Sequence, residues 1–241
     1  MKPSQKQTIL LFTFLLCITS IFSQRVKGNG KMTTVTRTTA SYDGVYCGGF
    51  MDFELVKGKE GSIIIEGEEN LIDYIITEVK DNKLIVKTKK NVNLKTSINK
   101  SIKITIPFEE INLVSLTGSG DLWTKDVLDV SDLKVSLTGS GDINLTSKNK
   151  TLESHLTGSG DIIFKGSTKN LKVMISGSGD VNASKLISDN TVVAISGSGD
   201  VSVVSNESLK AHVSGSGDIE YSGNPKKEET KVAGSGSISK R

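Results

Sequence analysis

Thr117-Gly118-Ser119-Gly120-Asp121-Leu122 decides the fold of this chain, because nearly the same residues return throughout its second half. The first glycine of the repeated motif falls at Gly118, Gly139, Gly158, Gly177, Gly197, Gly215 and Gly234. Successive copies lie 18 to 21 residues apart. A fixed period of this size is typical of a solenoid, in which short units stack along one axis.

Apolar and polar residues alternate in the segment before each of these glycines. The residue two positions before the glycine is always Leu, Ile or Val, namely Leu116, Leu137, Leu156, Ile175, Ile195, Val213 and Val232. The residue three positions before it varies in size and charge, from Ser115 to Lys231. Alternation with a period of two predicts a strand whose Leu, Ile and Val side chains face inward.

A second strand is predicted after each corner. The residue four positions beyond the first glycine is again apolar, as Leu122, Ile143, Ile162, Val181, Val201, Ile219 and Ile238 show. A unit of about 19 residues cannot bury its apolar face alone, so the units must stack and share one core. The sequence therefore predicts an all-β fold, a right-handed parallel β-helix (solenoid) with coils of about 19 residues.

The Gly-Ser-Gly-Asp corner itself has a structural explanation. Glycine adopts positive φ without steric cost, and an aspartate side chain accepts hydrogen bonds from nearby backbone N–H groups. Stacked corners would also align the Thr or Ser before each glycine, from Thr117 to Ser214, into a ladder of hydroxyl groups. The repeated motif is thus explained without a catalytic role.

Residues 1–23 have the layout of a secretory signal peptide, with Lys2 and Lys6 before an apolar run at residues 9–18. We therefore expect an exported protein, in the periplasm, outer membrane or at the cell surface. Removing this segment lowers the formal charge from +3 to 3 − 2 = +1. A balance so close to neutral, with few aromatic residues, argues against a nucleic-acid partner.

The chain contains two cysteines, Cys17 and Cys47. Leu16 stands where a lipoprotein signal would need a small residue, so cleavage near residue 23 is the better prediction. With Cys17 removed, Cys47 has no partner for an internal disulfide. We expect the exported domain to be held by its core and by backbone hydrogen bonds.

Residues 25–110 are β-rich but lack the repeat, so we expect them to complete and cap the coils of residues 111–241 within one structural domain, residues 25–241. Residues 25–60 are the expected cap. Residues 70–80 predict one helical turn followed by a strand, with a hairpin turn at 81–83. Pro107 is expected to end the pairing of the strand that precedes it.

Three segments of this half carry a family resemblance. They are Gly-Phe-Met-Asp-Phe-Glu-Leu at residues 49–55, Asp-Asn-Lys-Leu-Ile-Val at 81–86 and Ile-Thr-Ile-Pro at 104–107. Together with the repeated corners, they resemble the head GIN domain of putative auto-transporter adhesins, a family of exported bacterial proteins. The resemblance covers about residues 40–240. It implies a β-helical fold in the cell envelope and no established chemistry.

The corner carboxylates are the first candidate for chemistry. Their column consists of Asp121, Asp142, Asp161, Asp180, Asp200 and Asp218. Neighbouring carboxylates could serve a polysaccharide-acting enzyme or bind calcium, but catalysis needs two carboxylates in different environments and this column repeats one. Capping of corner amides is the favoured interpretation. The last corner has Ser237 instead, which suggests that each carboxylate contacts the next coil.

Other candidates are weaker. His155 and His212 share an outward column but stand three coils apart, too far for one metal. Ser119 lacks the sequence context of a catalytic nucleophile. Trp123 and Ile163 share an otherwise polar outward column. An exposed tryptophan could stack on sugar rings, although burial of Trp123 under the N-terminal cap is the favoured interpretation.

The sequence therefore predicts no catalytic, cofactor-binding or metal-binding residues. We expect an exported, non-enzymatic β-helical protein of the surface or envelope, an adhesin-like binding module. Its partner would be a glycan, an envelope component or a second copy of the chain. The alternative is a glycosidase or lyase built on a β-helix.

Overall fold

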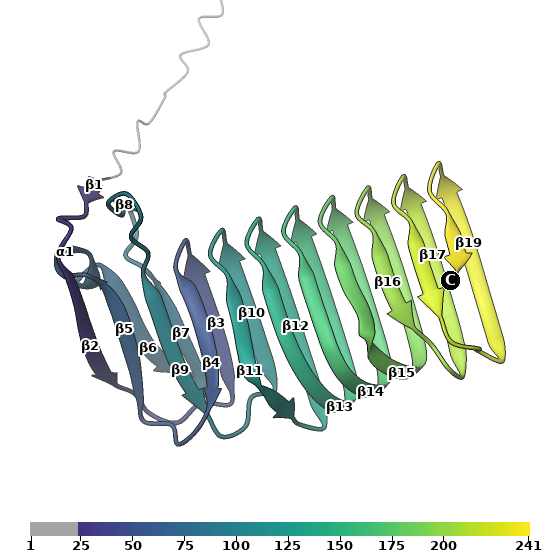
Figure 1. The fold of residues 1–241 in the computed structure, drawn as a ribbon, viewed down its shortest axis with the longest axis horizontal. Coiled ribbons are helices and arrows are strands. Elements are labelled where there is room, and N and C mark those ends of the chain that lie inside the picture. The colour runs from purple at the N-terminus through teal and green to yellow at the C-terminus, as the bar shows by residue number, and fades with distance from the viewer. Residues whose placement is uncertain (1–23) are drawn as a thin grey trace, which may run out of the picture.

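The computed structural model describes residues 24–241, so the predicted signal peptide lies outside the described residues. Figure 1 shows a flattened solenoid of stacked coils, with the Gly-Ser-Gly corners along its upper edge and loops along its lower edge. Each coil contributes one strand that enters the corner and one that leaves it. The predicted all-β solenoid of about 19-residue coils is thereby confirmed.

Parallel pairing builds two ladders of strands along the solenoid axis. The entry ladder runs through β7 (Lys83–Thr88), β3 (Gly44–Gly49), β10 (Leu113–Gly118), β12 (Asp132–Gly139), the second halves of β13 (Ile143–Gly158), β14 (Ile162–Gly177) and β15 (Val181–Gly197), then β17 (Ser208–Gly215) and β19 (Lys227–Gly234). The exit ladder runs through β9 (Lys103–Phe108), β4 (Asp52–Lys57), β11 (Leu122–Asp129), the first halves of β13, β14 and β15, then β16 (Val201–Val204), β18 (Ile219–Ser222) and β20 (Ile238–Lys240).

The core lies between the two ladders. Register keeps equivalent positions side by side, so Leu116 pairs with Leu137 and Leu137 with Leu156. All three side chains are buried, as the alternation predicts. In the last coil Val232 occupies the same column but is 42% exposed, since no further coil of the described chain covers it.

The first coils do not stack in chain order. Gly49 pairs with Gly118 and Phe53 with Leu122, so β3 and β4 form the coil that lies next to β10 and β11 along the solenoid axis. Strands β7 and β9 form the next coil toward the N-terminal end, beside β3 and β4. The chain thus returns from β9 past an existing coil before the repeats begin.

Antiparallel strands finish the N-terminal end. They are β6 (Ile75–Lys80) beside β7, β5 (Ser62–Glu68) beside β9, and β2 (Met32–Thr38) beside β5. The expected cap at residues 25–60 needs correction, because residues 44–57 form a coil inside the stack. Only part of that range caps the end, because Gly-Phe-Met-Asp at 49–52 takes the place of a Gly-Ser-Gly-Asp corner.

Two local predictions for residues 69–83 are confirmed. The short helix α1 (Glu69–Ile72) is followed by β6, as expected from the apolar spacing there. Asp81 and Asn82 have φ of 49° and 57° in the tight turn between β6 and β7, a conformation that Asn and Asp tolerate better than most residues.

The prediction that Pro107 ends the pairing of its strand is wrong for the neighbouring strand β4, with which β9 pairs as far as Phe108. Pro107 pairs with Val56, and the amide N of Gly58 donates to the Phe108 carbonyl at 2.9 Å. The backbone N–H and C=O groups of the even-numbered residues of β9 therefore point toward β4. Pro107 turns its missing N–H toward β5, where pairing already ends at Thr105, so no ladder hydrogen bond is lost.

A small flap forms a sheet of its own and packs its apolar face, including Leu94, against the core of the solenoid. Strands β1 (Gln24–Lys27) and β8 (Val92–Lys95) pair as a two-stranded sheet near the N-terminal end of the corner edge (Figure 1). We use the name flap for β1, β8 and the turn at residues 96–100. Within the described residues, no helix has the length and apolar character needed to cross a membrane.

Candidate functional site

Close approach of successive backbones explains both glycines of the corner. The amides of Ser140 and Gly141 donate to the Gly118 carbonyl at 2.9 and 3.2 Å. Gly139 has φ of 131°, and a Cβ there would lie 2.1 Å from the Gly118 carbonyl oxygen. A Cβ on Gly141 would lie 2.0 Å from the Gly120 oxygen. Any larger residue at either position would separate the coils.

The aspartates form a hydrogen-bonded ladder along the solenoid. The amide N of Asp142 donates to Asp121 Oδ1 at 3.1 Å, and that of Asp161 donates to Asp142 Oδ1 at 3.0 Å. The same bond recurs up to Asp218 at 2.8 to 3.0 Å. Each carboxylate therefore caps the corner of the next coil.

Both ends of this ladder are informative. Ser237 donates its amide N and its Oγ to Asp218 Oδ1 at 2.7 and 2.8 Å, so the contact with the next coil that Ser237 suggested is confirmed. The ladder starts at Asp52, which accepts the amide of Asp121 at 3.3 Å. Sequence reasoning missed Asp52, although its register with Asp121 follows once Gly49 is aligned with Gly118. Burial raises the pKa of Asp52 above its ordinary value.

A groove borders this ladder on the outer face of the exit strands. It has a volume of about 330 Å³ and is lined by Asp121, Asp142, Asp161, Trp123, Asn144 and Ile163, above the buried Leu122 and Ile143. Parallel register sets Trp123 beside Asn144 and Asn144 beside Ile163. We call this feature the Trp123 groove. It combines an aromatic ring, an aliphatic side chain, an amide and three carboxylates.

Trp123 is half-buried, so its expected burial under the N-terminal cap is wrong in degree. The neighbour in register on the N-terminal side is Glu54 of β4. Lys103 Nζ lies 5.8 Å from the centre of a Trp123 ring, a cation–π contact. A coil with polar outward side chains, rather than an apolar cap, therefore borders the ring.

Glu54 organises this border. Its carboxylate lies 2.6 Å from the Nζ atoms of both Lys103 and Lys125, while the glutamate side chain itself is nearly buried. Hydrogen bonds from Lys103 and Lys125 outweigh burial and lower the pKa of Glu54 to about 2. The carboxylate thus fixes Lys103 over one side of the groove.

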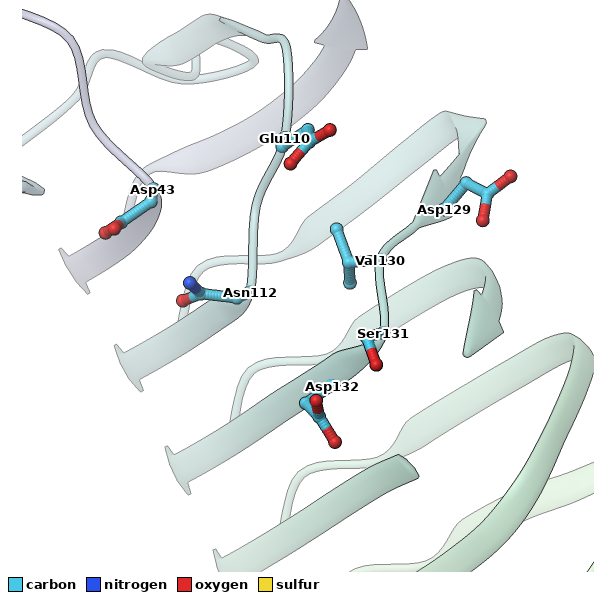
Figure 2. Close-up of a pocket in the computed structure, with 7 residues that line it drawn as sticks. All are labelled: Asp43, Glu110, Asn112, Asp129, Val130, Ser131 and Asp132. Carbon is cyan, nitrogen blue, oxygen red and sulfur yellow. The ribbon is translucent and has the colours of Figure 1, made fainter. Parts of the chain in front are cut away.

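The loop edge carries a second hollow of about 500 Å³, lined by acidic residues (Figure 2). Asp129 and Asp132 flank the turn between β11 and β12, whereas Asp43 and Glu110 precede β3 and β10. Figure 2 shows the four carboxylates pointing in different directions. Across residues 24–241, no group of three or more His, Cys, Asp or Glu side chains is arranged to hold a metal ion.

The remaining candidates are dispersed. His155 and His212 share one outward column, separated by Met174 and Ala194. His155 Nε2 lies 2.9 Å from Glu153 Oε1, which Lys172 also contacts at 2.8 Å. Ser119 is exposed on the corner edge. Register also aligns the hydroxyl column from Thr117 to Ser214, as expected.

Residues 41–225 match the family model described as "Putative auto-transporter adhesin, head GIN domain". No curated protein matches the sequence significantly.

Three solved structures share the fold. The chain is similar to a putative adhesin from Bacteroides fragilis, with a TM-score of 0.83, 24% identity, and coverage of 90% of this chain and 100% of that one. It is also similar to a putative lipid binding protein from Parabacteroides distasonis, with a TM-score of 0.75, 26% identity, and coverage of 90% of this chain and 100% of that one. The third is a putative adhesin from Parabacteroides merdae, with a TM-score of 0.76, 22% identity, and coverage of 90% of this chain and 99% of that one.

Proposed function

The chain belongs to the head GIN domain family of putative auto-transporter adhesins, and we propose that it is an exported, non-enzymatic envelope protein that binds glycan in the Trp123 groove. The family description names a binding role. The similar protein from Parabacteroides distasonis, at 26% identity, is named as a putative lipid binding protein, which is also a binding role. Export rests on the predicted signal peptide at residues 1–23 together with the family description.

The chemistry of the Trp123 groove is the observation that carries the proposal. The partly exposed indole of Trp123 offers a flat apolar face on which the C–H face of a sugar ring can stack. The hydrogen bonds between coils use Oδ1 of Asp121 and Asp142, so Oδ2 of each carboxylate is available to a sugar hydroxyl. The Asn144 amide adds both a donor and an acceptor.

Binding fits this groove better than catalysis. A glycosidase tunes two carboxylates to different pKa values through different surroundings. Asp121, Asp142 and Asp161 instead share one geometry, since each accepts the amide of the next corner through the same oxygen. A periodic row of equivalent acceptors suits a polymer with repeating hydroxyl groups.

Trp123 gives a direct measurement, because it is the only tryptophan of the chain. The protein as exported would be titrated with soluble envelope and host polysaccharides while its tryptophan fluorescence and the heat of binding are recorded. A true ligand should change the emission of Trp123. Trp123→Ala should weaken binding by about 30-fold, the effect of removing an aromatic side chain at the centre of an interface.

A matched pair of isoleucines provides the control. Ile163→Ser, in the Trp123 groove, should weaken binding, whereas Ile187→Ser should not, because Ile187 is exposed but does not line the groove. Equal affinity of the wild type and Trp123→Ala would reject the groove as the binding site. New reducing ends or unsaturated products in the same mixtures would instead support the polysaccharide-acting enzyme.

A further inference from the structure

The outer face of the flap carries a cluster of cations. Arg25 and Lys27 alternate with the inward-turned Val26 on β1, and their exposed side chains lie on the same face as those of Asn93 and Lys95 on β8. Register sets Arg25 beside Asn93 and Lys27 beside Lys95. Neither residues 24–31 nor residues 89–103 contain an Asp or Glu.

Placing Lys27 beside Lys95 is unfavourable in isolation. Like charges at neighbouring positions of adjacent strands destabilise a sheet, and a two-stranded sheet has little stability to spare. Within the described chain, no salt bridge involves Arg25, Lys27 or Lys95. An anionic partner would remove this repulsion.

An apolar side chain projects beside these cations. Ile98 is 90% exposed, the most exposed large apolar side chain in residues 24–241. It occupies the tip of a tight turn in which the Lys100 amide donates to the Ser97 carbonyl at 3.1 Å, with Asn99 at φ of 59°. Lys95 and Lys100 flank it in sequence. Amphipathic helices that lie in a membrane interface combine Lys and Arg with exposed apolar side chains, and the flap presents the same chemistry on a strand pair and a turn.

A buried carboxylate holds the flap in place. Glu68 is 0% exposed and accepts hydrogen bonds from Gly30 N at 2.5 Å, Ser97 N at 2.8 Å and Ser97 Oγ at 2.6 Å. Burial opposes the ionisation of Glu68, but these hydrogen bonds and the charge of Lys100 lower its pKa overall. The turn that carries Ile98 is therefore positioned before any partner arrives.

We propose that the outer face of the flap docks on the anionic phospholipid headgroups of a bilayer. Arg25, Lys27, Lys95 and Lys100 would lie among the phosphates, and Ile98 would enter the boundary with the acyl chains. The coils of the repeat continue away from the end that carries the flap (Figure 1).

Vesicle sedimentation tests the proposal. The protein as exported should bind vesicles of phosphatidylcholine with one third phosphatidylglycerol but not vesicles of phosphatidylcholine alone. Binding should weaken as ionic strength rises from about 0.05 M to about 0.5 M, because salt screens surface charge. Lys27→Ser with Lys95→Ser should weaken binding by about 30-fold, at about fivefold for each basic residue near an anionic surface.

Lys148→Ser with Lys150→Ser is the matched control, since both lysines are exposed but lie on the loop edge. This variant should bind vesicles within about twofold of the wild type. Ile98→Ser should weaken vesicle binding without altering the salt dependence. Melting temperatures of all variants would show that the fold is retained.

Three outcomes would overturn the proposal. One is equal binding to neutral vesicles, and another is equal loss in the two double-lysine variants. The third is release by millimolar inorganic phosphate at constant ionic strength, which would indicate a site for a single phosphate group rather than a membrane surface. Glycan binding in the Trp123 groove is a separate measurement and does not enter any of them.

Discussion

Glu54 links the N-terminal half of the chain to the Trp123 groove through one side chain. Its carboxylate holds both Lys103 and Lys125 at 2.6 Å. Without it, Lys103 would lose the partner that keeps its ammonium group near the Trp123 ring. The local chemistry of the groove therefore depends on a coil that lacks the Gly-Ser-Gly motif.

The lowered pKa of Glu54, about 2 against an ordinary value of 4.5, predicts a pH-dependent contribution to stability. A carboxylate with a lower pKa in the folded state stabilises above pH 4.5 and loses this contribution as pH falls toward 2. Glu54→Gln should thus lower the free energy of unfolding by about 1 to 3 kcal/mol at pH 6. The difference from wild type should shrink at pH 3 in urea unfolding. A difference independent of pH would contradict the role given to the charge.

At the scale of a strand, stability depends on the coil that follows. Val213 and Val232 occupy the same inward column in adjacent coils and pair with one another. Val213 is 0% exposed and Val232 is 42% exposed. The same residue type in the same column should therefore contribute differently.

We predict that Val213→Ala lowers the free energy of unfolding by about 2 kcal/mol, from two buried methyl groups and the cavity they leave. Val232→Ala should cost less than about 1 kcal/mol, because its side chain is already hydrated. Urea unfolding of both variants, followed by circular dichroism, makes the comparison. Equal losses would show that the last coil is covered in solution, as a second copy docked on it would do.

Across the whole molecule, the aspartate ladder connects coil to coil through hydrogen bonds from backbone amides. Each carboxylate of the ladder, from Asp52 through the corner aspartates to Asp218, already accepts a backbone amide of the next corner. An intramolecular hydrogen bond typically contributes about 1 kcal/mol to stability. Their regular spacing comes from the stacking of the coils and needs no metal to set it.

We therefore predict that calcium does not change the melting temperature. A ligand that binds only the folded state contributes about 2.7 kcal/mol at a hundredfold excess over its Kd, which would raise the melting temperature visibly. Melting would be compared in chelator and in millimolar calcium, for wild type and Asp161→Asn. A rise of several degrees that the variant diminishes would identify the ladder as a calcium site.

The candidate surfaces were only partly predictable from the sequence. The aspartate column and the Trp123 and Ile163 pair stand out by repetition and by type. Asp52 does not, because Phe50 and Met51 interrupt its corner motif. The flap cations were missed as well, although a lysine-rich run without acidic residues at 89–103 was a signal that could have been noticed.

The sequence by itself determined the period, the inward columns and the corner, because each depends on alternation and spacing within about 20 residues. Only the tertiary structure decided the order of the first coils, the pairing of Pro107 and the partial exposure of Trp123. These features depend on which distant strand lies alongside, as Glu54 of β4 does beside Trp123 of β11. The strands before residue 110 lie outside the regular repeat, so spacing along the chain does not show which distant strand each of them pairs with.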